Sequence, residues 1–332
     1  MKPVILAVDV GGTKTNLALA QVGKRSLTFL AQQTVRNQQY PSLESILKEF
    51  LKAHGVEPTQ ACLGVAGPIV DGRCEATNIP WITDPKRVAS AIGLPEVTLI
   101  NDLEATAYGI ETLPAKAFTV LNRGEAKPKT AIAVIAPGTG LGEAALIWDG
   151  TRYRAVPSEG GHVDFAPRNE LEMDLLRDLT KRFGGHVSYE RVLSGPGKVA
   201  IYQFLKETGR SSEPEDVATA LAVEDPSPLI SEFGLSGRSP RCAQALDLFV
   251  SILGAEAGNL CLKFLARGGV YLGGGIVPSI LPKLKDGTFM KSFIEKGRFT
   301  ELLSRIPVRV ILEEKTALFG AAKYAALTNH WR

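Results

Sequence analysis

The sequence predicts an α/β protein with two domains, and three observations support this prediction. The chain has 332 residues, which is enough for two domains of ordinary size, each with its own core. Short apolar runs of strand length alternate with segments in which apolar residues recur every three or four positions, as in a helix with one buried face. A unit of strand, glycine-rich turn and strand occurs once in each half, which indicates a duplicated architecture with one unit per domain.

The first half of the chain begins with one of these units and continues with alternating helices and strands. Residues 4–8 form a continuous apolar strand that ends at a glycine-rich turn, and a second strand follows at 15–20. The remaining elements of this half are a helix at 42–51 with Ser42 as its N-cap, strands at 61–66 and 97–100, and a helix at 103–113.

The second half repeats the strand, turn and strand and is richer in helices. A strand at 131–136 leads into the second glycine-rich turn, and strands at 144–148 and 153–156 follow. The later elements are helices at 170–183, 197–208 and 239–266, strands at 269–272 and 308–312, and a closing helix at 316–327. Residues 211–240 are rich in serine, proline and acidic residues, which predicts a surface excursion around one short helix.

Composition and charge exclude several classes of protein. The 38 Lys and Arg residues nearly balance the 35 Asp and Glu residues, and no basic run stands out, so we expect no nucleic-acid partner. No uninterrupted apolar run approaches the roughly 20 residues that cross a bilayer, so we expect no membrane partner. The first apolar run is broken by Asp9 and is no signal peptide, and the four cysteines are scattered. These features predict a cytoplasmic protein.

The glycine content of the chain stands out, and the placement of the glycines is informative. The chain has 33 glycines among 332 residues, or about 10%, whereas glycine makes up about 7% of an average protein. The first cluster lies in the turn made by Asp9, Val10, Gly11, Gly12, Thr13 and Lys14. Glycines let backbone N–H groups approach an anion, while Thr13 adds a hydroxyl donor and Lys14 a cation. The Asp9 carboxylate suits the water shell of Mg²⁺. A plain hairpin turn is the alternative interpretation of this segment.

Two further glycine clusters follow apolar strands. Gly138, Thr139, Gly140, Leu141 and Gly142 form the second turn, and Gly273, Gly274 and Gly275 follow the strand at 269–272. The second turn is no dinucleotide fingerprint, because its third glycine comes one residue early and a strand rather than a helix follows. This excludes an NAD-dependent dehydrogenase. Two glycine hairpins can instead clamp the β- and γ-phosphates of a nucleotide, with the third cluster as another site of close approach.

Polar residues near these turns are candidates for chemistry. Asn101 and Asp102 end a strand, where α/β folds place ligands; Asp102 can act as a general base, or the pair can simply cap a helix. Glu159 and His162 flank a Gly-Gly pair and supply donors and acceptors for a polyhydroxyl ligand. A zinc site is the alternative, but a single histidine without a neighbouring cysteine argues against it. Glu190 is a third candidate, although by itself it fits a solvated helix charge.

These segments resemble the bacterial glucokinases of the non-ROK type, in the hexokinase branch of the actin-like ATPase superfamily. The matching stretches are 9–13, 100–102, 138–142, 159–167, 190–197 and 273–278, which run in the order of the family and span nearly the whole chain. The glycine turns are common to all actin-like sugar kinases. The blocks at 159–167 and 190–197 are much more specific.

The resemblance implies an α/β, two-domain actin-like ATPase (ribonuclease H-like) fold with a cleft between the domains. We expect a small domain at 1–111 plus 314–332 and a large domain at 112–313. The implied activity is ATP-dependent phosphorylation of D-glucose to glucose 6-phosphate, with Mg²⁺ as cofactor and a homodimer as the assembly. The implied sugar-binding residues are Asn78, Asn101, Asp102, Glu159, His162 and Glu190, with Asp102 as the base.

The resemblance also assigns the nucleotide site. ATP phosphates are expected on Asp9, Val10, Gly11, Gly12, Thr13, Lys14, Gly138, Thr139 and Gly140, with Mg²⁺ held by Asp9 through water. Adenosine is expected near Gly273, Gly274 and Gly275.

Two alternatives stay open at this point, and two departures from related families are visible. The sugar can be another hexose, such as fructose, mannose or an N-acetylhexosamine. A catalytically dead sugar sensor is disfavoured, because the first strand begins at Val4 with no room for a DNA-binding segment and Asp102 is present. The cysteine-rich zinc motif of ROK kinases is absent after 159–162, and residues 211–240 match no family feature.

Overall fold

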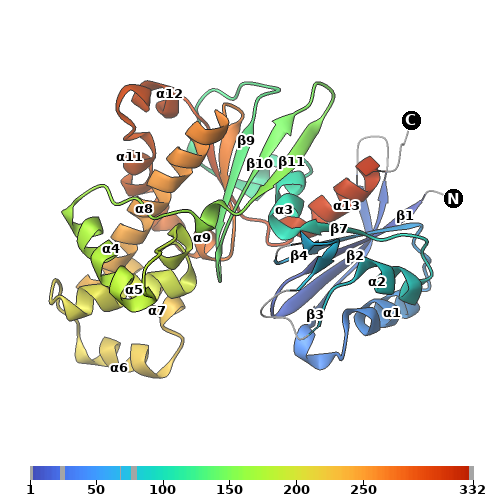
Figure 1. Ribbon diagram of the computed structural model, residues 1–332, viewed down its shortest axis with the longest axis horizontal. Helices are drawn as coiled ribbons and strands as arrows, with labels where there is room; N and C mark the ends of the chain where they lie inside the picture. Colours follow the sequence, from blue (N-terminus) through green and yellow to red (C-terminus); the bar gives the residue numbers. More distant parts are fainter. Residues whose placement is uncertain (1–2, 23–26, 68, 76–80, 329–332) are drawn as a thin grey trace. The chain divides into compact units, whose positions relative to one another are not determined.

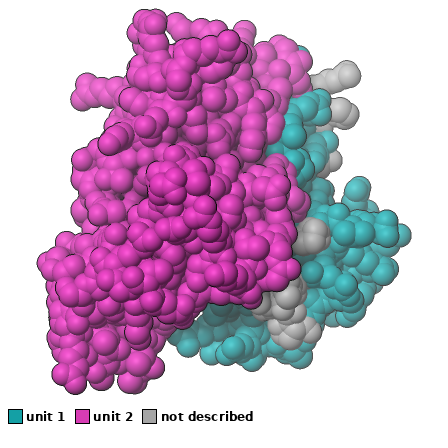
Figure 2. All heavy atoms as spheres, turned by 60° about the vertical axis from the view of Figure 1, so that its left-hand side comes forward, with its two compact units in different colours: residues 1–117, 151–157, 313–332 teal, residues 118–150, 158–312 magenta. Residues whose placement is uncertain are grey.

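The computed structural model describes residues 3–22, 27–67, 69–75 and 81–328. The chain divides into two compact units, shown in different colours in Figure 2. Unit 1 comprises residues 1–117, 151–157 and 313–332, and unit 2 comprises 118–150 and 158–312. The domain boundaries that the sequence suggests, at 111/112 and 313/314, stay a prediction about functional domains; the units divide at 117/118 and 312/313 and differ further by the 151–157 segment.

A five-stranded sheet forms the centre of unit 1 (Figure 1). Its strand order is β3 (Leu27–Arg36), β2 (Lys14–Val22), β1 (Val4–Val10), β4 (Gln60–Val65) and β7 (Thr98–Asn101). β2 is antiparallel to both β1 and β3, whereas β1, β4 and β7 are parallel. The smaller elements of this unit are η1 (Asn37–Gln39), β5 (Ile69–Val70), β6 (Arg73–Cys74) and η2 (Ala115–Ala117).

Helices cover both faces of this sheet, because the strand residues alternate between the faces. The helices are α1 (Leu43–His54), α2 (Pro85–Ile92), α3 (Asp102–Ile110) and α13 (Thr316–Thr328). Leu6 and Val8 of β1 pack in one cluster with α1 and α2. Ile5 and Ala7, which point to the other face, pack with α3 and α13. The last helix of the described chain therefore completes the unit that the first strand begins.

The second sheet repeats this arrangement and adds one strand. Its order is β11 (Tyr153–Ser158), β10 (Leu141–Trp148), β9 (Ile132–Pro137), β12 (Gly269–Leu272), β13 (Val308–Ile311) and β8 (Phe118–Asn122). β9 pairs antiparallel with β10 and parallel with β12, as β1 does with β2 and β4. The predicted duplication is thus confirmed in the strand topology.

Unit 2 carries most of the helices. They are α4 (Glu170–Phe183), α5 (Gly195–Glu207), α6 (Glu215–Val223), α7 (Pro226–Leu235), α8 (Pro240–Phe264), α9 (Ile276–Ser279), α10 (Leu281–Leu284), α11 (Thr288–Ile294) and α12 (Thr300–Ser304). Single 3₁₀ turns occur at η3 (Gly160–His162), η4 (Tyr189–Arg191) and η5 (Gly297–Phe299). The core of this unit lies around α8, which packs against α5, α7 and α11.

By length and composition, α8 would suffice to cross a membrane, since its most apolar window has a mean hydropathy of 1.5. However, 78% of that window is buried inside the structure. Burial within the core of unit 2 accounts for its apolar surface, as is common for a central helix.

Several element predictions need correction. The helix expected at 103–113 covers Asp102–Ile110, and the one expected at 197–208 begins at Gly195, because the Ser194 side chain caps it and Pro196 is accepted in a first turn. The segment 211–240 holds two helices, α6 and α7, rather than one. The strand β3 was not predicted; its alternation of half-buried and exposed residues is typical of an edge strand. Ser42 does cap α1, as predicted.

Candidate functional site

The first glycine turn joins β1 to β2, and the Asn37 side chain forms hydrogen bonds with its backbone. The Asn37 side chain is 1% exposed, and its Nδ2 donates to the carbonyl oxygens of Gly11 at 2.7 Å and Gly12 at 3.3 Å. Its Oδ1 accepts from the hydroxyl of Thr15 at 2.8 Å, and its backbone N donates to Thr13 O at 3.0 Å. The carbonyls are thus tied to the protein, which fixes the shape of the turn. Asn37 carries no motif in the sequence and was not among the predicted site residues.

Asp9 lies at the end of β1, directly before this turn. Its Oδ2 accepts a hydrogen bond from Asn16 Nδ2 at 2.9 Å, and Asn16 Oδ1 in turn accepts from Thr34 Oγ1 at 2.8 Å. Burial raises the pKa of the Asp9 carboxyl above its usual range, while the Asn16 hydrogen bond and the Lys14 charge oppose the rise. The carboxylate is oriented by neighbours, which fits a group that receives a cation and its water.

No cluster of three or more metal-binding side chains occurs within the described ranges. This does not conflict with Mg²⁺ at Asp9, because Mg²⁺ usually takes one or two carboxylates and completes its shell with phosphate oxygens and water. The donor set therefore fits a magnesium ion that arrives with a nucleotide, and does not fit a metal held by protein ligands alone.

Asn101 and Asp102 lie where β7 ends and α3 begins. Asn101 is the N-cap: its Oδ1 accepts from Leu103 N at 2.8 Å, and its Nδ2 donates to Gly67 O at 3.3 Å. Asp102 is the first residue of α3, and its Oδ1 also accepts from Leu103 N, at 2.9 Å. The capping interpretation is therefore correct for Asn101 and leaves the role of Asp102 open.

The second glycine turn joins β9 to β10 and is linked to two distant segments. Within the turn, Gly138 N donates to Gly140 O at 2.8 Å. From the start of α5, Gly195 N donates to Gly138 O at 2.8 Å. From η4, the Glu190 carboxylate accepts a hydrogen bond from Leu141 N at 3.0 Å. The turn is thus anchored on both sides, and one of its anchors is a predicted sugar-binding residue.

Glu159, His162 and Glu190 lie together in unit 2. His162 Nδ1 lies 4.0 Å from Glu190 Oε1, and His162 Nε2 lies 3.8 Å from Glu159 Oε2. The side chains of Glu159, His162 and Glu190 are 69%, 57% and 31% exposed, so a ligand can reach all three. The interpretation of Glu190 as a solvated helix charge is wrong, because it lies in a 3₁₀ turn and binds the backbone of Leu141.

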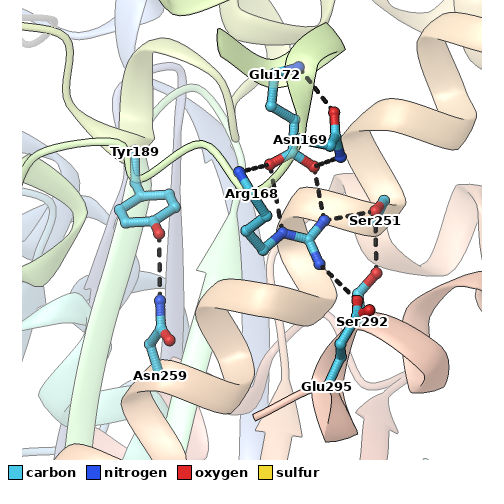
Figure 3. A network of polar contacts seen from close by, with 8 residues as sticks. All are labelled: Arg168, Asn169, Glu172, Tyr189, Ser251, Asn259, Ser292 and Glu295. Atoms are coloured by element: carbon cyan, nitrogen blue, oxygen red, sulfur yellow. Dashed lines mark hydrogen bonds and ion pairs between the residues drawn. The ribbon is translucent and has the colours of Figure 1, made fainter. Parts of the chain in front are cut away.

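Backbone pairing brings this cluster together from segments far apart in sequence. Tyr189 N donates to Val163 O at 3.0 Å, and Phe165 N donates to Val187 O at 2.9 Å, which places η4 beside η3. Arg168, which follows this segment in sequence, forms hydrogen bonds with residues of two helices (Figure 3). Its Nη2 donates at 2.7 Å to both Glu172 Oε1 and Ser251 Oγ. The cluster therefore rests on a hydrogen-bonded support that reaches α4 and α8.

The third glycine cluster follows β12, beside the second turn. Gly273 N donates to Ile135 O of β9 at 2.9 Å. Gly274 has a φ of +81°, and a Cβ there would lie 2.2 Å from Pro137 O, so packing against β9 already requires glycine. At Gly275 an added Cβ would meet no atom within 4 Å. Packing inside the protein thus explains Gly274, whereas the open space at Gly275 is available to a ligand.

The predicted site residues are divided between the two units. Unit 1 carries Asp9 to Lys14, Asn101 and Asp102; unit 2 carries Gly138 to Gly142, Glu159, His162, Glu190 and Gly273 to Gly275. Asn78 lies outside the described residues. A shallow hollow between α1 and α2 and another beside α12 are lined by none of these residues. Each unit thus carries a glycine turn between two strands, together with predicted carboxylates of its own.

The family model, the similar sequences and the similar solved structures all point to the same family. A family model described as Glucokinase matches residues 6–328. The glucokinase of Nostoc punctiforme is 41% identical over 337 residues, covering 97% of this chain and 99% of that protein. Among solved structures, the glucokinase of an Antarctic psychrotroph is 30% identical with a TM-score of 0.85, covering 98% of this chain and 100% of the other. The glucokinase of Balamuthia mandrillaris in complex with glucose is 25% identical with a TM-score of 0.82, covering 98% and 94%.

Proposed function

The chain belongs to the glucokinase family, and we propose that it transfers the terminal phosphoryl group of ATP to the 6-hydroxyl of D-glucose. The enzyme has the two-domain actin-like fold of sugar kinases. Within the site, one observation supports this activity best: Glu190 lies 4.0 Å from His162 and also binds the backbone of the second glycine turn at Leu141. A group that contacts sugar is thus joined directly to a turn that receives phosphate.

Asp102 is the general base of this reaction. Its carboxylate takes the proton of the 6-hydroxyl as the oxygen forms a bond to the γ-phosphorus, the bond between γ-phosphorus and the bridging oxygen breaks, and ADP leaves. Phosphoryl transfer depends mainly on positioning and on stabilisation of charge, so a fixed carboxylate at the start of α3 suffices. Mg²⁺, when bound, neutralises charge on the phosphates.

The two glycine turns hold the phosphates. The phosphate-binding residues are Val10, Gly11, Gly12, Thr13, Lys14, Gly138, Thr139 and Gly140, and Asp9 holds Mg²⁺ through water. The support for this assignment is the anchoring of both turns, by Asn37 in unit 1 and by Glu190 in unit 2. A backbone that is already fixed loses little entropy when the anion arrives. Adenosine lies near Gly273, Gly274 and Gly275.

The sugar is held by Asn101, Glu159, His162, Glu190 and Asn78, together with Asp102. Carboxylates accept hydrogen bonds from sugar hydroxyls, and a neutral imidazole both donates and accepts. Specificity for glucose arises because a hexose that lacks or misplaces one hydroxyl leaves one of these polar groups without its hydrogen-bond partner, which weakens binding.

A panel of hexoses tests the substrate. We expect ADP formation with glucose at a kcat/KM at least tenfold above that with fructose, mannose or N-acetylglucosamine, since a missing hydroxyl contact is worth about 1–3 kcal/mol. Coupled measurement of ADP release gives these values directly. ADP formation only with another hexose would overturn glucose as the substrate, and no ADP with any sugar would overturn the kinase activity.

A pair of glycine variants tests the adenosine site. Gly275→Ala is expected to raise the KM for ATP about tenfold, which corresponds to about 1.4 kcal/mol, without lowering the melting temperature. The reason is that the added carbon meets no protein atom within 4 Å. Gly274→Ala, in contrast, is expected to lower the melting temperature, because its Cβ would lie 2.2 Å from Pro137 O. An unchanged KM for ATP in Gly275→Ala would argue against adenosine at this position.

The partners of the enzyme are small molecules, glucose and ATP. The enzyme is a cytoplasmic homodimer in this proposal, and it has no nucleic-acid or membrane partner. Sedimentation equilibrium measures the assembly, and a mass of one chain at micromolar concentration would contradict the dimer.

A further inference from the structure

Glu143 is a buried carboxyl group that the proposed mechanism does not use. It lies in β10, directly after the second glycine turn, and is 1% exposed. Neither of its carboxyl oxygens has a hydrogen-bond partner within the described part of the chain. An ionised carboxylate in such a place is costly, because it loses its hydration and gains no counter-ion. The neutral, protonated form is therefore the form that the folded protein favours.

Glu143 contacts the turn that carries Glu159 and His162. An added Cβ on Gly160 would lie 2.1 Å from Glu143 Oε2, so the carboxyl group packs against the backbone of Gly160 itself. Ser158 closes the same turn, since its Oγ accepts from Gly160 N at 2.8 Å. The Glu143 carboxyl group thus determines how closely the backbone at Gly160 can approach β10. It thereby affects where the side chains of Glu159 and His162 lie.

The charged groups around this position come from several elements. Glu256 and Lys263, both on α8, act on Glu143 electrostatically: the Glu256 carboxylate raises the pKa of Glu143 and Lys263 lowers it. Glu256 is fully buried, and its oxygens are already occupied by Lys263 Nζ at 3.1 Å and Asn259 Nδ2 at 2.8 Å. Burial is the larger cause, and the pKa of Glu143 rises to about 8.

Two further titratable groups reach this region through Asn259. Its Nδ2 donates to the Tyr189 hydroxyl at 3.2 Å (Figure 3). Its Oδ1 accepts from Lys296 Nζ at 2.5 Å. Burial raises the pKa of the Tyr189 hydroxyl and lowers that of Lys296. On the side of the turn, Glu159 and His162 are the titratable neighbours, and both are mostly exposed. None of these contacts supplies Glu143 with a hydrogen bond.

We propose that Glu143 is a positioning residue for the sugar: its protonated carboxyl group supports the turn at residues 159–162, and loss of the proton weakens glucose binding. The inference rests on the proposed function of Glu159 and His162. An ionised Glu143 would place an unpaired charge against Gly160 and near the Glu256 carboxylate. Opening of the turn to water relieves that charge, and it displaces the sugar-binding side chains.

The sign of the pH dependence follows from which form binds. The competent form is protonated, so the KM for glucose is constant below the pKa of Glu143 and rises above it. With a pKa of about 8, about one molecule in eleven is competent at pH 9, which corresponds to a rise of about tenfold from pH 7 to pH 9. The value of kcat at saturating glucose stays nearly level, because saturation restores the competent form.

The experiment measures KM for glucose and kcat at saturating MgATP between pH 6.5 and 9.5 for the wild-type chain and three variants. Glu143→Gln keeps the shape without a titrating proton and is expected to abolish the alkaline rise in KM. Glu256→Gln removes the neighbouring charge and is expected to shift the rise to lower pH. Glu207→Gln removes an exposed carboxylate of unit 2 and is the matched control, expected to follow the wild-type profile.

The outcomes separate this inference from the proposed function. Wild-type turnover with glucose at pH 7 reports the function, whereas the difference between the pH profiles reports Glu143. An equal alkaline rise in wild type and Glu143→Gln would overturn the inference, and so would a wild-type KM that is constant to pH 9.5. If Glu143→Gln does not fold, Glu256→Gln carries the test, because a rise at unchanged pH in that variant contradicts the proposed ionisation.

Discussion

Replacement of Asp102 by asparagine is expected to lower kcat by about 10²- to 10⁴-fold, the usual contribution of a general base, while leaving the dissociation constant of glucose nearly unchanged. Asparagine retains an Oδ1 that can accept the hydrogen bond from Leu103 N, so the start of α3 stays intact. It cannot accept the proton of the 6-hydroxyl. Steady-state kinetics give kcat, and calorimetric titration with glucose gives the dissociation constant.

A matched control for this variant is Asp286→Asn. Asp286 also accepts a hydrogen bond at the start of a helix, from Thr288 N at 2.8 Å, but it lies outside the proposed site. We expect kcat of the control to equal that of the wild type. If Asp102→Asn keeps near-parental kcat, the base is another group; if it loses glucose binding and turnover together, Asp102 binds the sugar without acting as the base.

The largest effect on stability is expected from Gly320→Ala. Gly320 of α13 crosses α3 so closely that a Cβ would lie 1.6 Å from Ala105 O and 2.7 Å from Gly109 N. The helices must separate, and we expect a loss of about 2–3 kcal/mol in the free energy of unfolding from overpacking. This corresponds to about 5–10 °C in melting temperature. Because α3 begins with Asp102, kcat should fall as well.

Gly275→Ala is the control for this change, since it adds the same carbon where no atom lies within 4 Å. Thermal unfolding of both variants measures the loss of stability. The kcat of Gly320→Ala, measured well below its unfolding transition, reports the effect on activity separately. A melting temperature of Gly320→Ala within one degree of the wild type would show that the two helices can move apart freely, which would contradict the close crossing.

The strands around the glycine turns could be predicted because their signals are local. The strand expected at 269–272 has the same bounds in the structure, and the run at 4–8 lies within β1. An apolar run that ends in glycines needs no information from the rest of the chain. In contrast, β3 has alternating, half-polar residues, and it forms a strand only because β2 offers an edge to pair with.

The support beneath the site could not be predicted, because it depends on contacts between distant segments. Asn37 reaches Gly11 only once β2 and β3 have paired, and in sequence it is one polar residue among several. Glu143 violates the rule that carboxylates lie at the surface, and its burial depends on α8, which lies far along the chain. The proposed functional residues were visible as motifs, whereas the residues that support them were not.

The glycine surplus has two causes where the sequence suggested one. The expectation was that glycines let ligands approach the backbone. At Gly160, Gly161 and Gly274, however, an added Cβ would overlap a carboxyl oxygen or a carbonyl oxygen of the protein itself. These glycines therefore allow segments of the protein to pack closely around the site. Gly138 and Gly275 meet no atom within 4 Å, and they remain candidates for contact with a ligand.

The position of α13 has a consequence for how the chain folds during its synthesis. Leu318 and Ala321 cover the face of the sheet that carries Ile5 and Ala7, but they leave the ribosome only after all of unit 2 has followed those two residues. At about 5–20 residues per second, the roughly 310 residues between these positions correspond to a delay on the order of fifteen to sixty seconds. During this time a nascent chain can complete unit 2, while α3, which begins with the proposed base Asp102, still lacks its packing partner α13. We therefore expect activity to appear only when α13 has docked on α3.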